Sequence, residues 1–434
     1  MPEIARSDDL RRNNQRRILH ALRRHGPMSR TEISGATGLS ASTVTAITAA
    51  FLESGVLIEA SLPDNAMSRR GRPQVTLTLN PSTACVAALS LSLNRVSAAI
   101  VDYAGNVIRE TVNRFPTRQA DAQGLADIMA DTLRQACEAA SSASSETSPG
   151  LGPLRYIAMG VQGVTDSQGT TMLWSPITRH ANLPLAMLLE EEFGVPTILA
   201  NDCNMMAQAL KWQDPDHFGA SFAAVLLSHG IGMGLFVNGR QIGGISSSAT
   251  EFGHMMHVTA SHTREGAENS ALCRCGRIGC VEAYAGDYAI WRTAHGLDPM
   301  SQPVDDLEPE TMRHLADRAR NTDGPERIAY DTAGRAIGSA LRSMFALFDP
   351  FPVAFVGTGA AAFDLLQAPI RQTIGESAIG MATSDVKMFS FPDEFPLVRD
   401  GAAYAALDRL DANVLAPAEA LRAAPAARRL RHAI

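Results

Sequence analysis

The sequence predicts an α/β protein with a small, basic helical head followed by a larger, acidic body in which strands alternate with helices. Three observations predict this division. Residues 1–77 contain eleven arginines and no lysine against seven acidic residues, although the whole chain carries a formal net charge of −7. Apolar residues in the head recur at helical spacing. After Asn80 and Pro81 the pattern changes to short apolar runs separated by helical segments.

The composition fits a folded protein of the cytoplasm. The chain has 434 residues, of which 45% are hydrophobic and 19% charged, enough to bury more than one core. No apolar run approaches the roughly 20 residues that a membrane helix needs, and the first residues lack the apolar segment of a secretory signal. Six cysteines are too few for a disulfide scaffold. We therefore expect a protein of a reducing compartment with no membrane partner.

The head has the pattern of a helix-turn-helix. An amphipathic helix is expected over residues 13–25. Ser29, followed three residues later by Glu32, has the capping-box spacing and opens a second helix that ends near residue 37. After a glycine turn, Ser40 caps a third helix that ends near residue 54. Two short helices across a glycine turn are the arrangement that places the second helix in a DNA major groove.

The third helix and the segment after it carry the candidate DNA contacts. Polar residues near the start of this helix should face outward and contact bases: Ser42, Thr43 and Thr45. A two-stranded wing is expected over residues 56–60 and 75–79, with a basic tip that suits phosphates or a minor groove: Arg69, Arg70 and Arg72. A small oligomerisation bundle with solvated arginines is the alternative. Agreement of helices, turn and wing favours double-stranded DNA as the partner.

The body reads as alternating strands and helices. Strands are expected over residues 85–93, 97–102, 107–111, 156–160, 197–199, 222–227 and 353–355, with a helix over 120–139 and a loop over 141–153. Three glycine-bearing turns follow strands, at residues 160–163, 228–234 and 356–361. Glycine at such positions serves either a tight chain reversal or the approach of backbone amides to a phosphate.

A histidine and three cysteines form the strongest chemical pattern. His254 is followed by Cys273, Cys275 and Cys280, with glycines between the last two cysteines. Three thiolates and an imidazole complete a tetrahedral zinc set with no open position, so the Zn²⁺ is expected to be structural. Three buried, inert cysteines are the alternative, and His257 and His262 are rival histidines that lack the rest of the pattern.

Two segments of the body resemble the ROK family, which groups bacterial sugar-responsive repressors with sugar kinases. The more specific is TEFGH at 250–254 with CRCGRIGCVEAYAG at 273–286, similar to the family's E-x-G-H and C-x-C-G-x2-G-C-x-E signature. The other is ANDCNMMAQA at 200–209, similar to its N-D-x-N segment. The resemblance covers residues 13–411 and implies two actin-like (ribonuclease H-like) lobes with a zinc-stapled loop and a sugar held in the cleft.

The resemblance also implies a set of sugar contacts and a domain plan. The family's sugar-binding residues fall on Asn201, Asp202, Glu251, His254 and Glu282. Carboxylates and amides at fixed positions suit the vicinal hydroxyls of a sugar or sugar phosphate. The expected domains are a winged helix-turn-helix at 1–80, a sugar-kinase-like sensor at 81–411 and an Ala/Arg-rich tail at 412–434. A homodimer or homotetramer would present paired heads to palindromic operator DNA.

The choice between regulator and enzyme depends on the phosphate loop. Asp202 matches the general base of the family kinases, but their Asp-x-Gly-Gly-Thr loop corresponds here to Ser90–Asn94, which lacks the Asp and both glycines. A leucine in place of glycine prevents close backbone approach to phosphate. We therefore expect a repressor that is not an enzyme; the alternatives are an ATP-dependent sugar kinase and a regulator controlled by a protein partner. Gln162 and Thr250 also depart from the family pattern near the ligand.

Overall fold

The structure is a computed structural model that describes residues 7–60, 75–142, 150–243, 250–258, 270–304, 307–375 and 386–412. The chain divides into two compact units. Unit 1 comprises Met1–Gly163, Gln168–Ala200 and Ala402–Ile434, and unit 2 comprises Val164–Ser167 and Asn201–Gly401. Within the described ranges no single helix is long and apolar enough to cross a membrane; only a helix pair bent by 118° passes that test, on length and composition.

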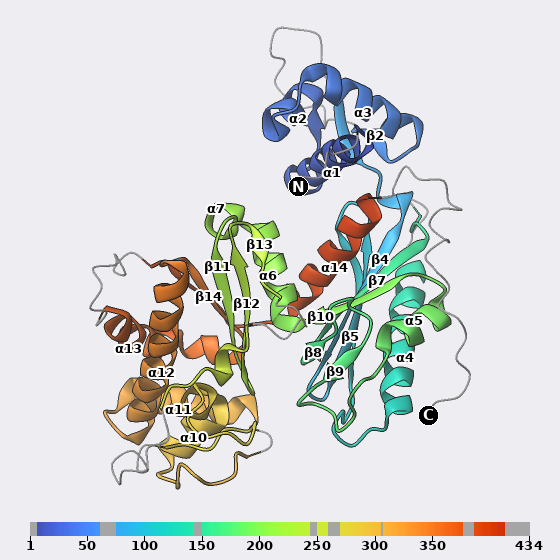
Figure 1. Cartoon of the computed structure of the whole chain (residues 1–434). Helices are drawn as coiled ribbons and strands as arrows, with labels where there is room; N and C mark the ends of the chain where they lie inside the picture. The colour runs from blue at the N-terminus through green and yellow to red at the C-terminus, as the bar shows by residue number, and fades with distance from the viewer. Residues whose placement is uncertain are drawn as a thin grey trace. The chain divides into compact units, whose positions relative to one another are not determined.

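The head folds as a winged helix-turn-helix at the start of unit 1 (Figure 1). Its elements are α1 (Ser7–His25), β1 (Met28–Ser29), α2 (Arg30–Thr37), α3 (Ala41–Glu53), β2 (Leu57–Glu59) and β3 (Thr76–Leu79). The capping box of Ser29 and Glu32 forms as the sequence predicts, and Gly38 ends α2 at φ 66°. The strands lie in the order β1-β3-β2, so the sheet has one strand more than the two-stranded wing predicted. The additional strand, β1, is only two residues long, which is too short to give a recognisable sequence pattern.

The first lobe is a five-stranded sheet in unit 1 with the order β10-β7-β4-β5-β6. Its elements are β4 (Cys85–Ser92), β5 (Arg95–Asp102), β6 (Val107–Arg114), α4 (Ala122–Ser142), β7 (Leu154–Val161), the short strand β9 (Met172–Trp174), α5 (Leu185–Phe193) and β10 (Thr197–Asn201). The short strand β8 (Val164–Thr165), between β7 and β9 in sequence, belongs to unit 2. The apolar faces of α4 and α5 bury one face of the sheet.

The second lobe, in unit 2, is also built on a five-stranded sheet, with the order β13-β12-β11-β14-β15. Its elements are α6 (Asp202–Gln213), α7 (Pro215–Phe218), β11 (Phe222–Leu227), β12 (Ile231–Val237), β13 (Arg240–Gln241), the 3-10 helix η2 (Phe252–His254), α9 (Glu282–Ala285), α10 (Asp287–Ala294), α11 (Pro309–Asn321), α12 (Pro325–Phe348), β14 (Val353–Val356), η3 (Thr358–Ala362), α13 (Phe363–Gly375) and β15 (Met388–Phe391). Helix α14 (Phe395–Asp411) belongs to unit 2 up to Gly401 and to unit 1 from Ala402 onward.

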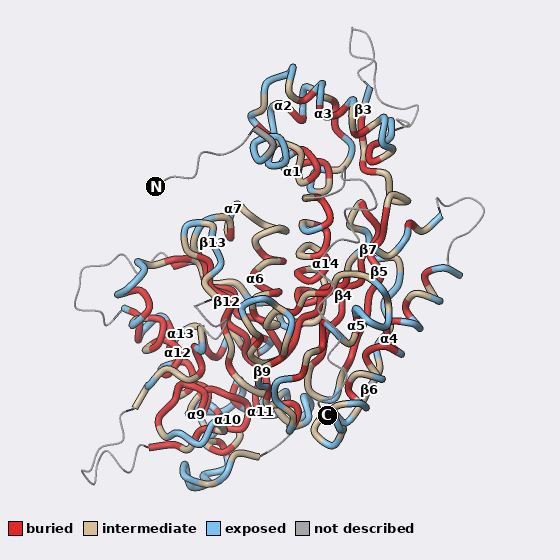
Figure 2. Tube along the Cα trace, turned by 45° about the vertical axis from the view of Figure 1, so that its right-hand side comes forward, coloured by how far each residue is buried: buried red, intermediate tan, exposed pale blue. Residues whose placement is uncertain are grey.

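Both lobes have the same topology. In each, three consecutive antiparallel strands (β4-β5-β6 and β11-β12-β13) are followed by a strand that pairs parallel with the first of them (β7 and β14), and a last strand lies beside that one at the edge of the sheet (β10 and β15). The sheets and the helix faces turned toward them form the buried interior of each lobe (Figure 2). This duplication is the two-lobed actin-like architecture that the sequence implies, and α14 begins in unit 2 and ends in unit 1.

One predicted turn is shorter than expected. The sequence suggested a glycine-bearing turn over residues 228–234; the chain does turn after β11, at residues 228–230, but Gly232 and Gly234 lie inside strand β12, which pairs antiparallel with β11. The glycines are needed for packing rather than for chain reversal. A Cβ at position 232 would collide with Cys203 Sγ, and one at position 234 would collide with the carbonyl oxygen of Cys203. Helix α6 therefore approaches the backbone of β12 directly.

Candidate functional site

The start of α6 holds the first two predicted sugar-contact residues. Asn201 is the N-cap, and its Oδ1 accepts hydrogen bonds from the backbone N–H groups of Cys203 at 2.9 Å and Asn204 at 3.3 Å. The Cys203 N–H also donates to Asp202 Oδ1 at 2.9 Å. Burial raises the pKa of Asp202 to about 6, although these hydrogen bonds oppose the rise. The helix thus fixes a carboxyl group that titrates near neutral pH.

Glu251 and His254 occupy a strained segment beside β12. Thr250 has φ 72°, which is costly for a β-branched residue, and its Oγ1 donates to the Met233 carbonyl at 2.7 Å. The Glu251 side chain is 51% exposed, and its Oε2 lies 3.9 Å from His254 Nε2. Burial raises the pKa of Glu251, although His254 opposes the rise. The strain at Thr250 accompanies the placement of an exposed acid beside His254.

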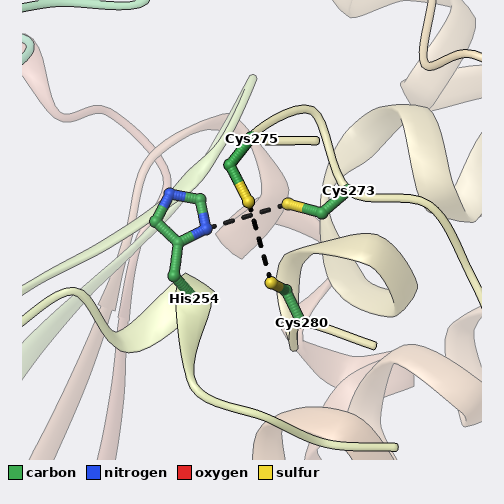
Figure 3. A group of neighbouring side chains, drawn as sticks. All are labelled: His254, Cys273, Cys275 and Cys280. Carbon is green, nitrogen blue, oxygen red and sulfur yellow. Dashed lines mark hydrogen bonds between the residues drawn. The ribbon is translucent and has the colours of Figure 1, made fainter. Parts of the chain in front are cut away.

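The histidine and three cysteines meet as the sequence predicts (Figure 3). One ligand atom from each of His254, Cys273, Cys275 and Cys280 lies within 4.8 Å of the others, a group that could hold a metal ion. Cys273 Sγ is 3.7 Å from His254 Nδ1, and Cys275 Sγ is 3.8 Å from Cys280 Sγ. His254 therefore turns Nδ1 toward the sulfurs and Nε2 toward Glu251. The rival His257 packs edge-on against Tyr284, and His262 lies outside the described residues.

The glycines between the cysteines shape this cluster. Gly276 and Gly279 have φ 82° and 87°, and a Cβ at position 279 would collide with the Val258 carbonyl oxygen. The three thiols differ. Burial raises the pKa of Cys273 and of Cys280. Although burial opposes it, hydrogen bonds from Arg277 lower the pKa of Cys275. The thiolate, the form that binds a metal, is thus favoured by the surrounding protein only at Cys275.

Glu282 joins the cysteine cluster to the turn between β11 and β12. Its side chain is buried, and its Oε2 accepts a hydrogen bond from the Ile231 N–H at 3.2 Å. Its Oε1 lies 3.6 Å from Cys273 Sγ and accepts a hydrogen bond from the Tyr288 hydroxyl at 3.4 Å. Both carboxylate oxygens of Glu282 therefore have partners within the protein. This residue links the turn to the cysteine cluster and is also one of the predicted sugar contacts.

Arg274 contacts the candidate site and was not identified from the sequence. Its guanidinium donates to the backbone carbonyls of His229 and Val304 and lies 4.7 Å from the centroid of the Tyr288 ring. It stands between two metal-ligand candidates and binds the turn that Glu282 also binds. No local signal identifies it, because its partners lie 45 and 30 residues away in sequence.

The segment corresponding to the kinase phosphate loop is closed by side chains of the first lobe. The Ser90 and Ser97 hydroxyls lie 2.8 Å apart across the β4–β5 hairpin. The Leu93 N–H donates to Gln162 Oε1 at 3.2 Å, and the Gln162 N–H donates to the Leu91 carbonyl at 3.0 Å. Gln162, which departs from the family pattern, thus accepts the hydrogen bond of a backbone amide at the tip of the hairpin.

The third glycine turn, after β14, also has a packing explanation. Gly357 has φ 99°, and a Cβ there would lie 2.7 Å from the Leu227 carbonyl oxygen at the end of β11. A Cβ at position 359 would lie 2.9 Å from Leu227 Cβ. Glycine is required at both positions whether or not a nucleotide binds.

In the head, α3 exposes two of the three polar residues that were predicted to face outward. Ser42 and Thr45 are exposed and Thr43 is half-buried, while Val44, Ile47 and Phe51 are buried. The Ser40 hydroxyl lies within hydrogen-bonding distance of the Ser42 and Thr43 hydroxyls, at 3.0 and 2.8 Å. The wing arginines Arg69, Arg70 and Arg72 lie outside the described residues.

This combination defines a class of protein: a winged helix-turn-helix joined to a two-lobed, actin-like body. The profile of the ROK family matches residues 89–394, and a profile described as winged helix-turn-helix DNA-binding matches residues 11–58. The chain belongs to the ROK family.

Its relatives in sequence carry the names of regulators. The xylose repressor of Caldicellulosiruptor bescii is 24% identical over 377 residues, covering 85% of this chain and 88% of the relative. The DNA-binding transcriptional dual regulator NagC of Escherichia coli is 24% identical over 388 residues, covering 87% of this chain and 88% of the relative.

Solved structures agree on the fold. A ROK family transcriptional regulator described as a homolog of the E. coli MLC protein superposes with a TM-score of 0.73 at 22% identity, covering 94% of this chain and 98% of its own. A ROK family glucokinase from Streptomyces griseus, in complex with glucose and AMPPNP, gives 0.55 at 22% identity, covering 74% and 99%. The family fold therefore accommodates both regulators and kinases.

Proposed function

We propose that this protein is a sugar-responsive transcriptional repressor that lacks kinase activity. The head would bind operator DNA with α3 in the major groove, through Ser42, Thr43 and Thr45, and with the arginines of the wing on phosphates or in the minor groove. Repressor names among the relatives in sequence, together with the winged helix-turn-helix profile, support this proposal.

One observation carries the choice of regulator over enzyme. Phosphoryl transfer needs the nucleotide phosphates held by a close backbone loop and by Mg²⁺. In this chain the Leu93 amide is bonded to Gln162, and Ser90 pairs with Ser97 where the kinases have a carboxylate. A loop whose donor is already satisfied and whose glycines are replaced has lost the groups that position ATP.

The effector would be a sugar or a sugar phosphate bound by Asn201, Asp202, Glu251, His254 and Glu282. Glu251 is the most accessible carboxylate of this group, and the Nε2 of His254 faces it. Asp202 offers an oxygen from the first turn of α6. Carboxylates and imidazole at fixed positions recognise vicinal hydroxyls by charge-assisted hydrogen bonds.

The cysteine cluster would hold a structural Zn²⁺. Tetrahedral coordination with Zn–S bonds of about 2.3 Å places ligand atoms about 3.6 to 3.8 Å apart. The separations of 3.7 Å between Cys273 and His254 and 3.8 Å between Cys275 and Cys280 fit this geometry. His254, Cys273, Cys275 and Cys280 would fill all four positions. The ion would then staple the loop and orient His254, rather than activate water.

The assembly would be a homodimer or homotetramer, because two symmetric heads are required to read a palindromic operator. Within each chain we propose a DNA-binding domain at 1–80, a sensor at 81–411 and a tail at 412–434. Sugar binding would change the relation between paired heads and release the operator.

The second candidate function is an ATP-dependent sugar kinase, and one observation favours it. Asp202 matches the family's catalytic base, and its pKa of about 6 suits proton abstraction from a hydroxyl near neutral pH. The same carboxyl group would serve equally well as a hydrogen-bond acceptor in a sensor.

Retention of genomic DNA tests the proposal. The purified, zinc-loaded protein is incubated with sheared genomic DNA at moderate salt, and the retained fragments are sequenced. We expect a few palindromic sites, and we expect retention to fall when Arg69, Arg70 and Arg72 are replaced by alanine. Retention equal to that of the substituted protein would contradict DNA binding. ATP turnover in a sugar panel that disappears in Asp202→Asn would establish the kinase instead.

A further inference from the structure

The head is fixed within unit 1 by an ion pair that is almost completely buried. Arg23 of α1 donates from Nη1 to Asp411 Oδ2 at 2.7 Å, and the two side chains are 2% and 0% exposed. The Tyr103 hydroxyl, from the turn between β5 and β6, donates to Asp411 Oδ1 at 2.8 Å. Arg23 also donates to the Tyr103 carbonyl from Nε and Nη2, at 3.3 and 3.2 Å. Three elements therefore meet at one carboxylate.

A second acid on α14 extends this contact along α1. Arg16 pairs with Asp408, and His20 Nε2 lies 3.1 Å from the same carboxylate. Arg16, His20 and Arg23 are separated by four and three residues, so they share one face of α1. Asp408 and Asp411 are three residues apart and share one face of α14. The head is thus held by the last turn of α14 through two successive carboxylates.

The geometry of the Arg23–Asp411 pair makes it sensitive to displacement. Two charges removed from water are stable together only when their geometry is good and their remaining hydrogen bonds are satisfied. Here Asp411 accepts from two groups and the aliphatic part of Arg23 packs on Gly105, where a Cβ would lie 3.3 Å from Arg23 Cγ. Because water does not reach this pair, a movement of the end of α14 either moves α1 with it or leaves two buried charges unpaired.

The part of α14 that belongs to unit 2 packs against α6, the helix whose first turn carries candidate sugar contacts. Gly401 lies so close to α6 that a Cβ would collide with the Met205 carbonyl oxygen. Next to it, Gln213 Nε2 of α6 donates to Asp400 Oδ2 at 2.9 Å. Helix α6 begins at Asp202 with Asn201 as its cap. The helix that would contact sugar therefore touches α14 backbone to backbone, with no side chain at Gly401 to absorb a shift.

We propose that α14 transmits the state of α6 to the DNA-binding head, and that Arg23 and Asp411 are the positioning residues that complete this path. The inference rests on the proposed function, since it names how sugar and operator binding are coupled. Sugar bound at the start of α6 displaces α6, the close contact at Gly401 displaces α14, and the acids at the end of α14 reorient α1. A continuous series of contacts, from α6 to Gly401 and from Asp411 to Arg23, supports this path, and coupling measured between its two ends would establish it.

Thermodynamic linkage provides a test that does not need the identity of the sugar. If sugar binding changes operator affinity through this path, operator binding must change the state of α6 by the same coupling free energy. The probe is an operator fragment retained from genomic DNA, and the readout is amide hydrogen exchange of peptides from α6 and α14 in the full-length, zinc-loaded protein.

The variants separate coupling from simple attachment of the head. Arg23→Gln, Asp411→Asn and the milder Asp408→Asn are compared with Arg134→Gln/Glu192→Gln, which removes an exposed ion pair (N–O distance 2.9 Å) elsewhere in unit 1. In the unsubstituted protein and the control, we expect operator DNA to change α6 exchange about fivefold or more. Arg23→Gln and Asp411→Asn should lose this change while still retaining operator DNA, and Asp408→Asn should lose part of it.

Each outcome decides the inference. A change in α6 exchange that persists in folded Arg23→Gln and Asp411→Asn overturns the path, as does no change in the unsubstituted protein. If both substitutions prevent folding, Asp408→Asn decides: full coupling in it overturns the path, and partial loss supports it. If no DNA is retained by the unsubstituted protein, the proposed function itself has failed. Retained DNA without any response of α6 refutes the coupling alone.

Discussion

The two lobes have the same strand order, yet they close the equivalent hairpin turn in different ways. In the first lobe the β4–β5 turn is closed by an uncharged side chain, Gln162, which accepts from the Leu93 N–H. In the second lobe the β11–β12 turn is closed by a carboxylate, Glu282, which accepts from the Ile231 N–H. One backbone donor at each turn is bound by the protein itself, and in neither turn is that donor available to a phosphate.

The two turns differ in the residues that surround the side chain closing each turn. Glu282 continues to Cys273 and to Tyr288, so its turn is connected to the metal-ligand candidates and to Arg274. Behind the turn closed by Gln162 lies a hydroxyl pair, Ser90 and Ser97, in a buried hairpin. In the second lobe the turn is therefore connected to the candidate metal ligands through a buried carboxylate, while the first lobe packs the same position with small neutral side chains.

Removal of the metal should have the largest effect, and it should be confined to the second lobe. Cys280→Ser removes a buried ligand from a site with no spare position, so we expect loss of stoichiometric zinc and a loss of stability of unit 2 on the order of 5 kcal/mol or more. Cys137→Ser, a half-buried cysteine of the first lobe, is the control. Zinc content and protease resistance of each lobe are the measurements.

A Cys280→Ser protein that keeps its protease resistance without zinc would show that the cluster is not structural. Equal loss of resistance in both lobes would break the comparison in another way, because it would mean that the lobes do not unfold separately.

The glycines of β12 should come next. Gly232→Ala places a Cβ against Cys203 Sγ, and we expect a loss of about 2 kcal/mol from overpacking. Cys203→Ala should restore most of it, because the obstructing sulfur is removed. Gly234→Ala should not be rescued, since the obstruction there includes the backbone carbonyl of Cys203. Urea denaturation of the single and double variants gives the coupling free energy. Absence of rescue at position 232 would refute packing as the reason for that glycine.

This glycine strand also shows where prediction from sequence fails. Local patterns predicted the head well, because the capping box of Ser29 and Glu32 and the cap at Ser40 depend on residues within three positions. The glycines of β12 were interpreted as a turn, since glycine favours turns locally and the Cys203 contact that requires it is 29 residues away for Gly232. Strand β12 was therefore not predicted, because the contact that requires its glycines is made with a residue distant in sequence.

The candidate site divides in the same manner. The four metal-ligand candidates could be predicted because their spacing is itself the signal, and they meet as expected. Gln162 was noticed as a departure, but its bond to Leu93 spans 69 residues. The Arg23–Asp411 pair spans 388 residues, and only a folded chain brings the two side chains together.

The two units should respond to pH with opposite signs. Burial raises the pKa of Asp202 to about 6 and that of Asp287 to about 7, with Arg274 opposing the rise at Asp287. Folded unit 2 thus binds protons that the unfolded chain, with carboxyl pKa values near 4, does not. Its stability should therefore fall as the pH rises from about 4 to about 7 and then stay constant.

In unit 1 the sign is reversed. Although burial opposes it, hydrogen bonds with His20 and Arg16 hold the pKa of Asp408 well below its usual range. That contribution is present above about pH 4 and is lost as the pH falls below it. Hydrogen exchange of each unit between pH 3 and 8 measures both trends. Asp287→Asn should flatten the neutral limb in unit 2 and Asp408→Asn the acid limb in unit 1, and parallel profiles in the unsubstituted protein would contradict the assignment.

The smallest expected effect concerns the closed turn of the first lobe. Gln162→Leu keeps the volume of the side chain but removes the acceptor for the Leu93 N–H, so we expect a loss of about 1 kcal/mol and faster exchange of that amide. Gln168→Leu, at an exposed position of the same unit, is the control and should change little. We expect Gln162→Leu to bind ATP no better than the unsubstituted protein, because freeing one amide does not restore the missing carboxylate and glycines. If this single substitution allowed ATP to bind, the Gln162 side chain would be blocking an otherwise complete phosphate site. The turns of the two lobes would then differ in one side chain rather than in their backbone and surrounding residues.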